Sequence, residues 1–198
     1  MERRVVLRLG VLGSGKGSNY QAIQQAIDAG RLDAGVRVVI SDVESAGILQ
    51  FAREHKIRAE FVEPGKFRTK LEPENEQRVV EILKSERVDL VVLAGYMRMV
   101  KEPLLRAFPH RIVNIHPSLL PKFRGLAAWR QALEAGEKIT GCTVHWVDEG
   151  MDTGAILAQR DVPVLPGDTP ESLHARIQVA EHAIYPEVIA RIADGILR

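Results

Sequence analysis

The sequence contains a single cysteine, Cys142, so no disulfide can form within the chain. Its 27 basic side chains nearly balance its 26 acidic ones, and a net charge of +1 argues against binding to a nucleic-acid backbone. No apolar run approaches the ~20 residues that cross a bilayer. Arg8 interrupts the short apolar run near the N-terminus, which favours a first strand over a signal peptide. We therefore expect a cytoplasmic protein with neither a nucleic-acid nor a membrane partner.

With 198 residues, 45% of them apolar, the chain can bury a sizeable core as one domain, residues 1–198. Apolar β-branched runs alternate with segments of helical period, which is typical of βαβ units. We predict strands at residues 5–12, 36–40, 58–62, 90–93, 112–115, 141–147 and 155–162, and helices at 19–29, 46–55, 73–85, 127–135 and 170–193, the last with Thr169 as N-cap. The fold class is α/β, with a Rossmann-like, mostly parallel twisted sheet and helices on both faces.

A glycine-rich segment, GSGKGSN at 13–19, follows the first predicted strand. Glycines let the backbone approach an anion, and the N–H groups at a helix start favour negative charge, so the segment is a candidate phosphate site. It departs from the nucleotide-binding P-loop pattern because Gly17 stands where a Ser or Thr would hold magnesium. It also departs from the dinucleotide pattern at Ser18. A P-loop-like nucleotide-binding protein and a plain turn without a ligand are the alternatives.

Polar residues end the strand at 112–115, where Asn114 and His116 share one face because side chains alternate along a strand. Asp152 lies in a polar loop that can fold over the same edge. An amide donor, an imidazole and a carboxylate are the groups that acyl-type transfer requires. The alternative is a histidine packed in the core and satisfied by its neighbours. No nucleophile is implied, and His116 and Asp152 lack a third metal ligand at recognisable spacing.

The segments NIHPSLLPKFRG at 114–125 and RQALEAGEKITGCTVHWVDEGMDTGAIL at 130–157 resemble the formyl-transfer motif of the folate-dependent formyltransferases. The glycine-rich segment, LAGYMR at 93–98 and QVAEHAIYP at 178–186 resemble the members that formylate glycinamide ribonucleotide during purine synthesis. The resemblance covers nearly the whole chain. It implies the formyltransferase fold, with a phosphate-binding half at about 1–100 and a folate-binding, catalytic half at about 101–198.

The resemblance implies that an amine attacks the formyl carbon of 10-formyltetrahydrofolate directly, through a tetrahedral intermediate. Asn114 and protonated His116 would stabilise the oxyanion, while Asp152 would keep His116 charged and help move a proton. It places the ribonucleotide at Gly17, Ser18, Asn19, Gln178 and Glu181, with Arg68 or Lys70 as the basic partner of the phosphate. It places the folate, mainly on backbone groups, at Met97, Arg98, Met99, Val100, Asn114, Met151 and Asp152. The implied co-substrate is 10-formyltetrahydrofolate, and no metal is expected.

Three alternatives share parts of this pattern. Methionyl-tRNA formyltransferases resemble the catalytic half but add a C-terminal domain, and formyltetrahydrofolate deformylases add an N-terminal one, so we expect neither in a chain of this length. A folate-binding module without catalysis is the third alternative. Residues 127–129 depart from the family's polar pattern and receive no contact, and His145 is either a support for the site or a packed strand residue. The sequence leaves a monomer and a homodimer equally open.

Overall fold

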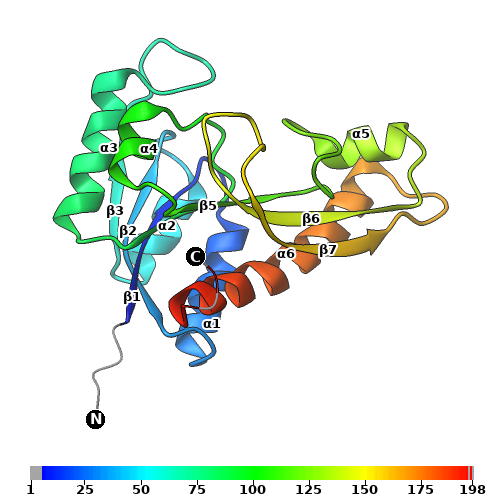
Figure 1. The fold of residues 1–198 in the computed structure, drawn as a ribbon, viewed down its shortest axis with the longest axis horizontal. Helices are drawn as coiled ribbons and strands as arrows, with labels where there is room; N and C mark the ends of the chain where they lie inside the picture. Colours follow the sequence, from blue (N-terminus) through cyan, green and yellow to red (C-terminus); the bar gives the residue numbers. More distant parts are fainter. Residues whose placement is uncertain (1–5, 196, 198) are drawn as a thin grey trace.

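The computed structural model describes residues 6–195 and 197, which form a seven-stranded sheet with helices on both faces (Figure 1). The strands are β1 (Leu7–Leu12), β2 (Ala34–Ser41), β3 (Arg58–Phe61), β4 (Leu90–Leu93), β5 (Ile112–His116), β6 (Ile139–Trp146) and β7 (Ile156–Pro163). The helices are α1 (Ser18–Asp28), α2 (Gly47–Glu54), α3 (Pro73–Ser85), α4 (Glu102–Ala107), α5 (Ala128–Glu134) and α6 (Pro170–Ala193).

The strand order is β3-β2-β1-β4-β5-β6-β7. The first five strands of this order are parallel, whereas β6 runs antiparallel to β5 and β7 antiparallel to β6. The chain moves outward from β1 through β2 to β3 and then returns to place β4 on the other side of β1. This reversal creates a switch point between β1 and β4, where open α/β sheets bind ligands beyond the carboxyl ends of their strands.

The predicted elements are all present, with bounds that agree within two residues. The start of the first predicted strand, Val5, lies outside the described residues. Thr169 caps α6 as predicted, because its side chain accepts a hydrogen bond from the backbone N–H of Ser172. Helix α4, which has six residues, was not predicted from the sequence. The backbone N–H of Lys101, the residue before its first turn, donates a hydrogen bond to the Oε1 of Glu76 of α3 at 2.7 Å.

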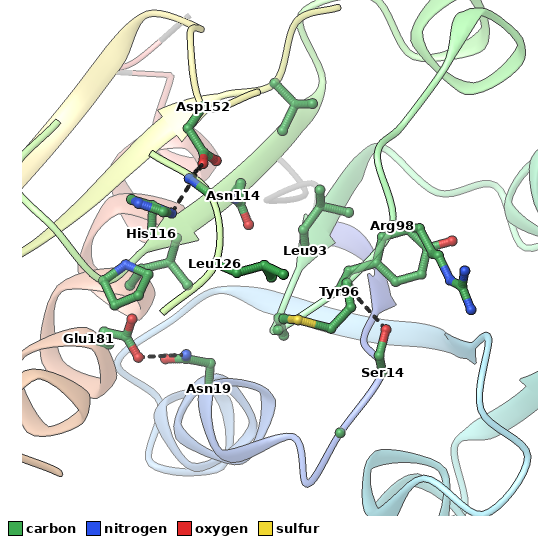
Figure 2. Close-up of a pocket in the computed structure, with 18 of the residues that line it drawn as sticks. Ser14, Asn19, Leu93, Tyr96, Arg98, Asn114, His116, Leu126, Asp152 and Glu181 are labelled. Carbon is green, nitrogen blue, oxygen red and sulfur yellow. Dashed lines mark hydrogen bonds and ion pairs between the residues drawn. The ribbon is translucent and has the colours of Figure 1, made fainter. Parts of the chain in front are cut away.

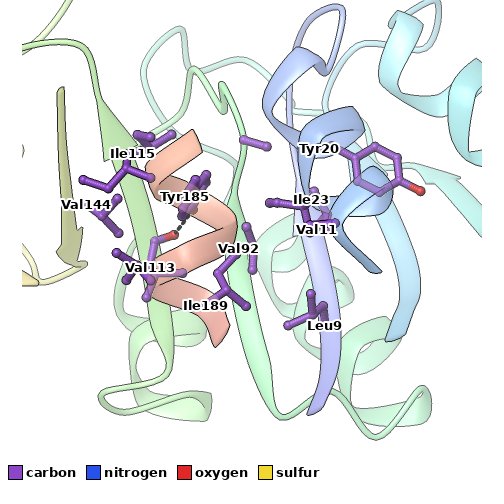
Figure 3. Packing of buried hydrophobic residues seen from close by; sticks show 14 of the residues in the cluster. Leu9, Val11, Tyr20, Ile23, Val92, Val113, Ile115, Val144, Tyr185 and Ile189 are labelled. Atoms are coloured by element: carbon purple, nitrogen blue, oxygen red, sulfur yellow. Dashed lines mark hydrogen bonds between the residues drawn. The ribbon is translucent and has the colours of Figure 1, made fainter. Parts of the chain in front are cut away.

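Two apolar clusters cover the two faces of the sheet. On one face, Val92 and Val113 pack against α1 and against Tyr185 and Ile189 of α6 (Figure 3). The Tyr185 hydroxyl donates to the carbonyls of Leu93 and Val113 at 2.9 and 3.1 Å. On the other face, α3 and α4 bury Leu12, Val91, Ile112, Val79, Leu83 and Leu104. Helices therefore pack on both faces of the strands that meet at the switch point. None of the described helices combines the length and apolar character of a membrane span.

Candidate active site

A cavity of about 670 Å³ lies at the carboxyl ends of β1, β4 and β5, between the starts of α1 and α5 and the middle of α6. Asn114, His116 and Asp152 gather in one part of it, and Asn19 faces Glu181 in another (Figure 2). The predicted site residues in its wall are Gly17, Ser18, Asn19, Met97, Arg98, Met99, Val100, Asn114, His116, Met151, Asp152, Gln178 and Glu181. The topology therefore brings residues from both halves of the sequence into one cavity.

The loop between β1 and α1 presents backbone amides to this cavity. Gly17 is the N-cap of α1, and its φ of 79° is a left-handed conformation that favours glycine. A Cβ at this position would lie 2.6 Å from a side-chain carbon of Ile48. No side chain among the described residues caps the first turn of α1. The N–H groups at this helix start can therefore bind an anion, as the predicted phosphate site requires.

Asn114 is oriented by a histidine from the neighbouring strand. The antiparallel pairing of β5 with β6 sets Asn114 opposite His145, and the Asn114 Nδ2 lies 3.2 Å from the His145 Nε2. The Nδ1 of His145 lies 2.7 Å from the carbonyl oxygen of Trp146, and its Nε2 lies 3.6 Å from the Asp152 Oδ1. Of the two interpretations of His145, the structure supports the first, because the ring links Asn114 to Asp152.

His116 and Asp152 form a buried pair. The His116 Nδ1 lies 3.3 Å from the Asp152 Oδ2, and its Nε2 lies 2.8 Å from the carbonyl oxygen of Phe123. Burial lowers the pKa of His116, whereas the Asp152 charge and the Phe123 carbonyl favour its protonated form. Both ring nitrogens thus face hydrogen-bond acceptors, an arrangement that suits an imidazolium.

The Asp152 carboxylate is kept ionised by its surroundings. Burial alone would raise its pKa, but the nearby His145 ring, the charge of His116 and the Gly125 N–H at 2.9 Å lower it below the ordinary value. Asp152 has a φ of 53°, so the loop after β6 turns sharply to present this side chain. Within the described residues, no group of three or more His, Cys, Asp and Glu side chains is placed to hold a metal ion.

Glu181 projects from α6 toward the start of α1. Its Oε2 accepts a hydrogen bond from the Asn19 Nδ2 at 3.0 Å (Figure 2). Burial raises the pKa of Glu181 to about 7, and the bond from Asn19 only partly opposes that rise. A carboxyl group that titrates near neutrality beside the anion-binding loop can accept a hydrogen bond from an amine in the cavity.

Comparison with known proteins decides the family. The protein-family model described as formyl transferase matches residues 7–189, which is nearly the whole chain. The chain belongs to the formyltransferase family. This formyltransferase is 40% identical over 185 residues to the phosphoribosylglycinamide formyltransferase of Bacillus subtilis, and the match covers 93% of this chain and 94% of that protein.

Longer relatives and solved structures agree with this family. The formyltransferase is 46% identical over 196 residues to a trifunctional purine biosynthetic protein of Drosophila pseudoobscura pseudoobscura, covering 96% of this chain but only 14% of that protein's length. The crystal structure of glycinamide ribonucleotide transformylase 1 from Symbiobacterium toebii superimposes with a TM-score of 0.92 at 50% identity, covering 96% of this chain and 89% of that one. A formyltetrahydrofolate deformylase from Pseudomonas syringae has a TM-score of 0.88 at 26% identity, covering 96% of this chain and 62% of that one.

The part of the formyltransferase's cavity lined by Trp129 and His174 was not predicted from the sequence. Trp129 of α5 and His174 of α6 stack with their ring centroids 3.7 Å apart and an angle of 5° between the ring planes. Both rings line the cavity, as does Leu126, a residue that is 77% exposed. No sequence pattern links positions 129 and 174, because only the packing of α5 against α6 brings them together. The position of His145 follows from the β5–β6 register, which the sequence analysis did not predict.

Arg68 and Lys70 are not among the described residues that line the cavity. The Lys70 ammonium lies 4.6 Å from the centre of the Phe67 ring, and the Arg68 carbonyl accepts a hydrogen bond from Arg98. The guanidinium of Arg98 points away from His116 (Figure 2) and donates to Asp42, and the contact of the Arg98 backbone with a folate stays a prediction. The choice between Arg68 and Lys70 as a phosphate ligand stays a prediction.

Proposed function

We propose that this protein transfers the formyl group of 10-formyltetrahydrofolate to the amine of glycinamide ribonucleotide, the step that supplies a formyl group in purine synthesis. One observation carries the proposal. Asn114, His116 and Asp152 line the same cavity as the uncapped start of α1 and Glu181, so two ligands bound at these groups would share one space. The match to phosphoribosylglycinamide formyltransferases over almost the full chain supports the choice of acceptor.

The reaction joins an amine to a formyl carbon without a covalent enzyme intermediate. The amine nitrogen forms a bond to the formyl carbon, the carbonyl oxygen becomes an oxyanion, and the bond to the folate nitrogen then breaks. Asn114 donates a hydrogen bond to the oxyanion, and the positive charge of His116 stabilises it across a desolvated site. The charge of Asp152 favours this protonated form of His116 against the effect of burial. Together the two side chains move the proton released by the amine, directly or through water, to the departing folate nitrogen.

The two substrates approach from opposite sides of the switch point. The phosphate of the ribonucleotide binds the amides of Gly17, Ser18 and Asn19, assisted by Arg68 or Lys70, while Gln178 and Glu181 hold its amine end. The folate lies along residues 97–100, where Met97 is 57% exposed, and against Met151, Asn114 and Asp152. We infer that the protein works in the cytoplasm on these two small molecules, needs no metal, and acts as a monomer or homodimer.

The experiment measures the release of a tetrahydrofolate analogue by absorbance, with and without glycinamide ribonucleotide. The proposal predicts that release requires the acceptor. Release without the acceptor would indicate a deformylase instead, and binding without release would indicate a folate-binding module. Magnesium-dependent binding of ATP or GTP, measured by calorimetry, would instead support the nucleotide-binding alternative.

A further inference from the structure

An ion pair next to the cavity connects loops from three strands. Asp42 follows β2, and its side chain is 2% exposed. Its Oδ1 accepts a hydrogen bond from the Ser14 hydroxyl at 2.5 Å, and its Oδ2 accepts one from the Arg98 Nε at 2.7 Å. Ser14 follows β1 and Arg98 follows β4. We call Ser14, Asp42 and Arg98 the Asp42 network.

The Asp42 network joins the predicted phosphate loop to the predicted folate segment. The Ser14 hydroxyl oxygen, which donates to Asp42, also accepts a hydrogen bond from the backbone N–H of Met97 at 2.9 Å (Figure 2). The backbone N–H of Ser14 donates to the Gly95 carbonyl at 3.0 Å. Residues 13–19 and 95–100 are therefore held side by side at the switch point, through a hydroxyl that Asp42 orients.

The Asp42 network also holds the loop that contains the two basic candidates. The Arg98 Nη1 donates to the carbonyls of Phe67, at 2.9 Å, and Arg68. The backbone N–H of Met99 donates to the Thr69 carbonyl at 2.8 Å, which continues the contact along the next residues. The Arg98 guanidinium thus holds residues 67 and 68, and the Met99 N–H holds Thr69, while the guanidinium charge is balanced by a buried carboxylate.

We propose that Asp42 and Arg98 are positioning residues that set the relative placement of the ribonucleotide loop and the folate segment. The inference deepens the function proposed above and rests on it. The Asp42 carboxylate faces Ser14 and Arg98 instead of a substrate, so its effect on binding passes through the loops. Removing the carboxylate leaves the Arg98 charge without its partner and frees the Ser14 hydroxyl, and both loops then lose their fixed geometry.

The test compares steady-state constants of Asp42→Asn, Ser14→Ala and the unchanged enzyme. For Asp42→Asn, the KM values for both substrates should rise at least about fivefold, at the lower limit of typical coupling between sites, while kcat changes less. Ser14→Ala keeps the Asp42–Arg98 pair but loses both hydrogen bonds of the hydroxyl, to Asp42 and from Met97, so it should raise both KM values by a smaller factor. If Asp42→Asn does not fold, the KM values of Ser14→Ala alone test whether the Asp42 network affects substrate binding.

The matched control is Asp89→Asn. Asp89 immediately precedes β4 and accepts two side-chain hydrogen bonds from Arg8 of β1, at 2.8 and 2.6 Å, at the amino ends of these strands and so away from the cavity. This variant should lower the Tm without moving either KM. The proposal would be overturned if Asp42→Asn or Ser14→Ala folds with a lower Tm but keeps both KM values within twofold of the unchanged enzyme. The Asp42 network would then have a structural role only.

A second measurement separates this inference from the proposed function. Hydrogen exchange of the backbone amides of Ser14, Met97 and Met99 needs no substrate. In Asp42→Asn these amides should exchange faster, and in Asp89→Asn they should not. An inactive wild-type enzyme with this exchange pattern would contradict the proposed function but keep the role of Asp42 in holding the loops. Unchanged exchange would contradict the role of Asp42 whatever the activity.

Discussion

Replacing Asp152 with asparagine removes the buried charge that faces His116. The two side chains are 13% and 6% exposed, and the atoms that face each other are 3.3 Å apart. Unit charges at this distance interact by about 5 kcal/mol at an effective dielectric constant of about 20. This energy is the most that removing the charge can add to the activation barrier. Since about 1.4 kcal/mol corresponds to tenfold in rate, the ceiling on the loss of rate lies between about 10³ and 10⁴. We expect kcat to fall by about 10² to 10³, which lies below this ceiling and within the range that general acid–base groups contribute.

The sign of the pH effect follows from the same pair. Burial lowers the pKa of His116 and Asp152 opposes that shift, so the asparagine variant lowers the pKa further. The proposed active form carries imidazolium, which is lost as the pH rises through the His116 pKa. The variant should therefore lose its remaining activity at a lower pH than the wild type, and mild acidification should restore part of it.

The assay is the pH profile of kcat, with the His116 ring followed by NMR in parallel. Glu149→Gln is the matched control, because it removes one negative charge from the same loop at an exposed position. A fall in kcat of less than tenfold for Asp152→Asn, with the basic limb of the profile unmoved, would refute the reasoning.

Three further predictions concern other parts of the cavity. Asn114→Ala should lower kcat by about 10² to 10³ with an unchanged Tm, and near-normal turnover in a steady-state assay would contradict its role. Because burial raises the pKa of Glu181 to about 7, the carboxylate should form, and the KM for the ribonucleotide should fall, as the pH rises through that value. As the pH rises from 4.5 to about 7, the free energy of unfolding of the wild type should fall relative to that of Glu181→Gln, as measured by urea titration; equal slopes would be evidence against it. Gly17→Ala places a Cβ against Ile48 at a position with a left-handed backbone conformation. Calorimetry should therefore show weaker ribonucleotide binding and a lower Tm. Unchanged values would count against the role of residues 13–19 in phosphate binding.

The sequence predicts the strands and long helices because their apolar periods directly reflect which face is buried. Residues 73–85 and 170–193 match α3 and α6 to the residue. Helix α4 is too short for a period to show, and its N-terminus depends on Glu76 from another helix. The pairing of β6 against β5 also depends on contacts between distant segments, which local patterns do not contain.

The candidate site likewise contains residues that the sequence predicts and contacts that only the folded structure reveals. Asn114, His116 and Asp152 could be predicted because polar residues at a strand end and a family motif indicate them together. The Trp129–His174 stack and the Asp42–Arg98 pair join residues 45 and 56 positions apart, and neither pair lies in a local pattern. Such contacts depend on how α5 meets α6 and how the ends of β2 and β4 approach each other, which only the folded structure determines.

The most direct measurement follows an isotope-labelled formyl group from 10-formyltetrahydrofolate in the presence of the purified protein and glycinamide ribonucleotide. The proposed function predicts that NMR finds the label in an amide on the glycinamide nitrogen, and that Asn114→Ala nearly abolishes its appearance. Label recovered only as free formate, with the ribonucleotide unmodified, would contradict it.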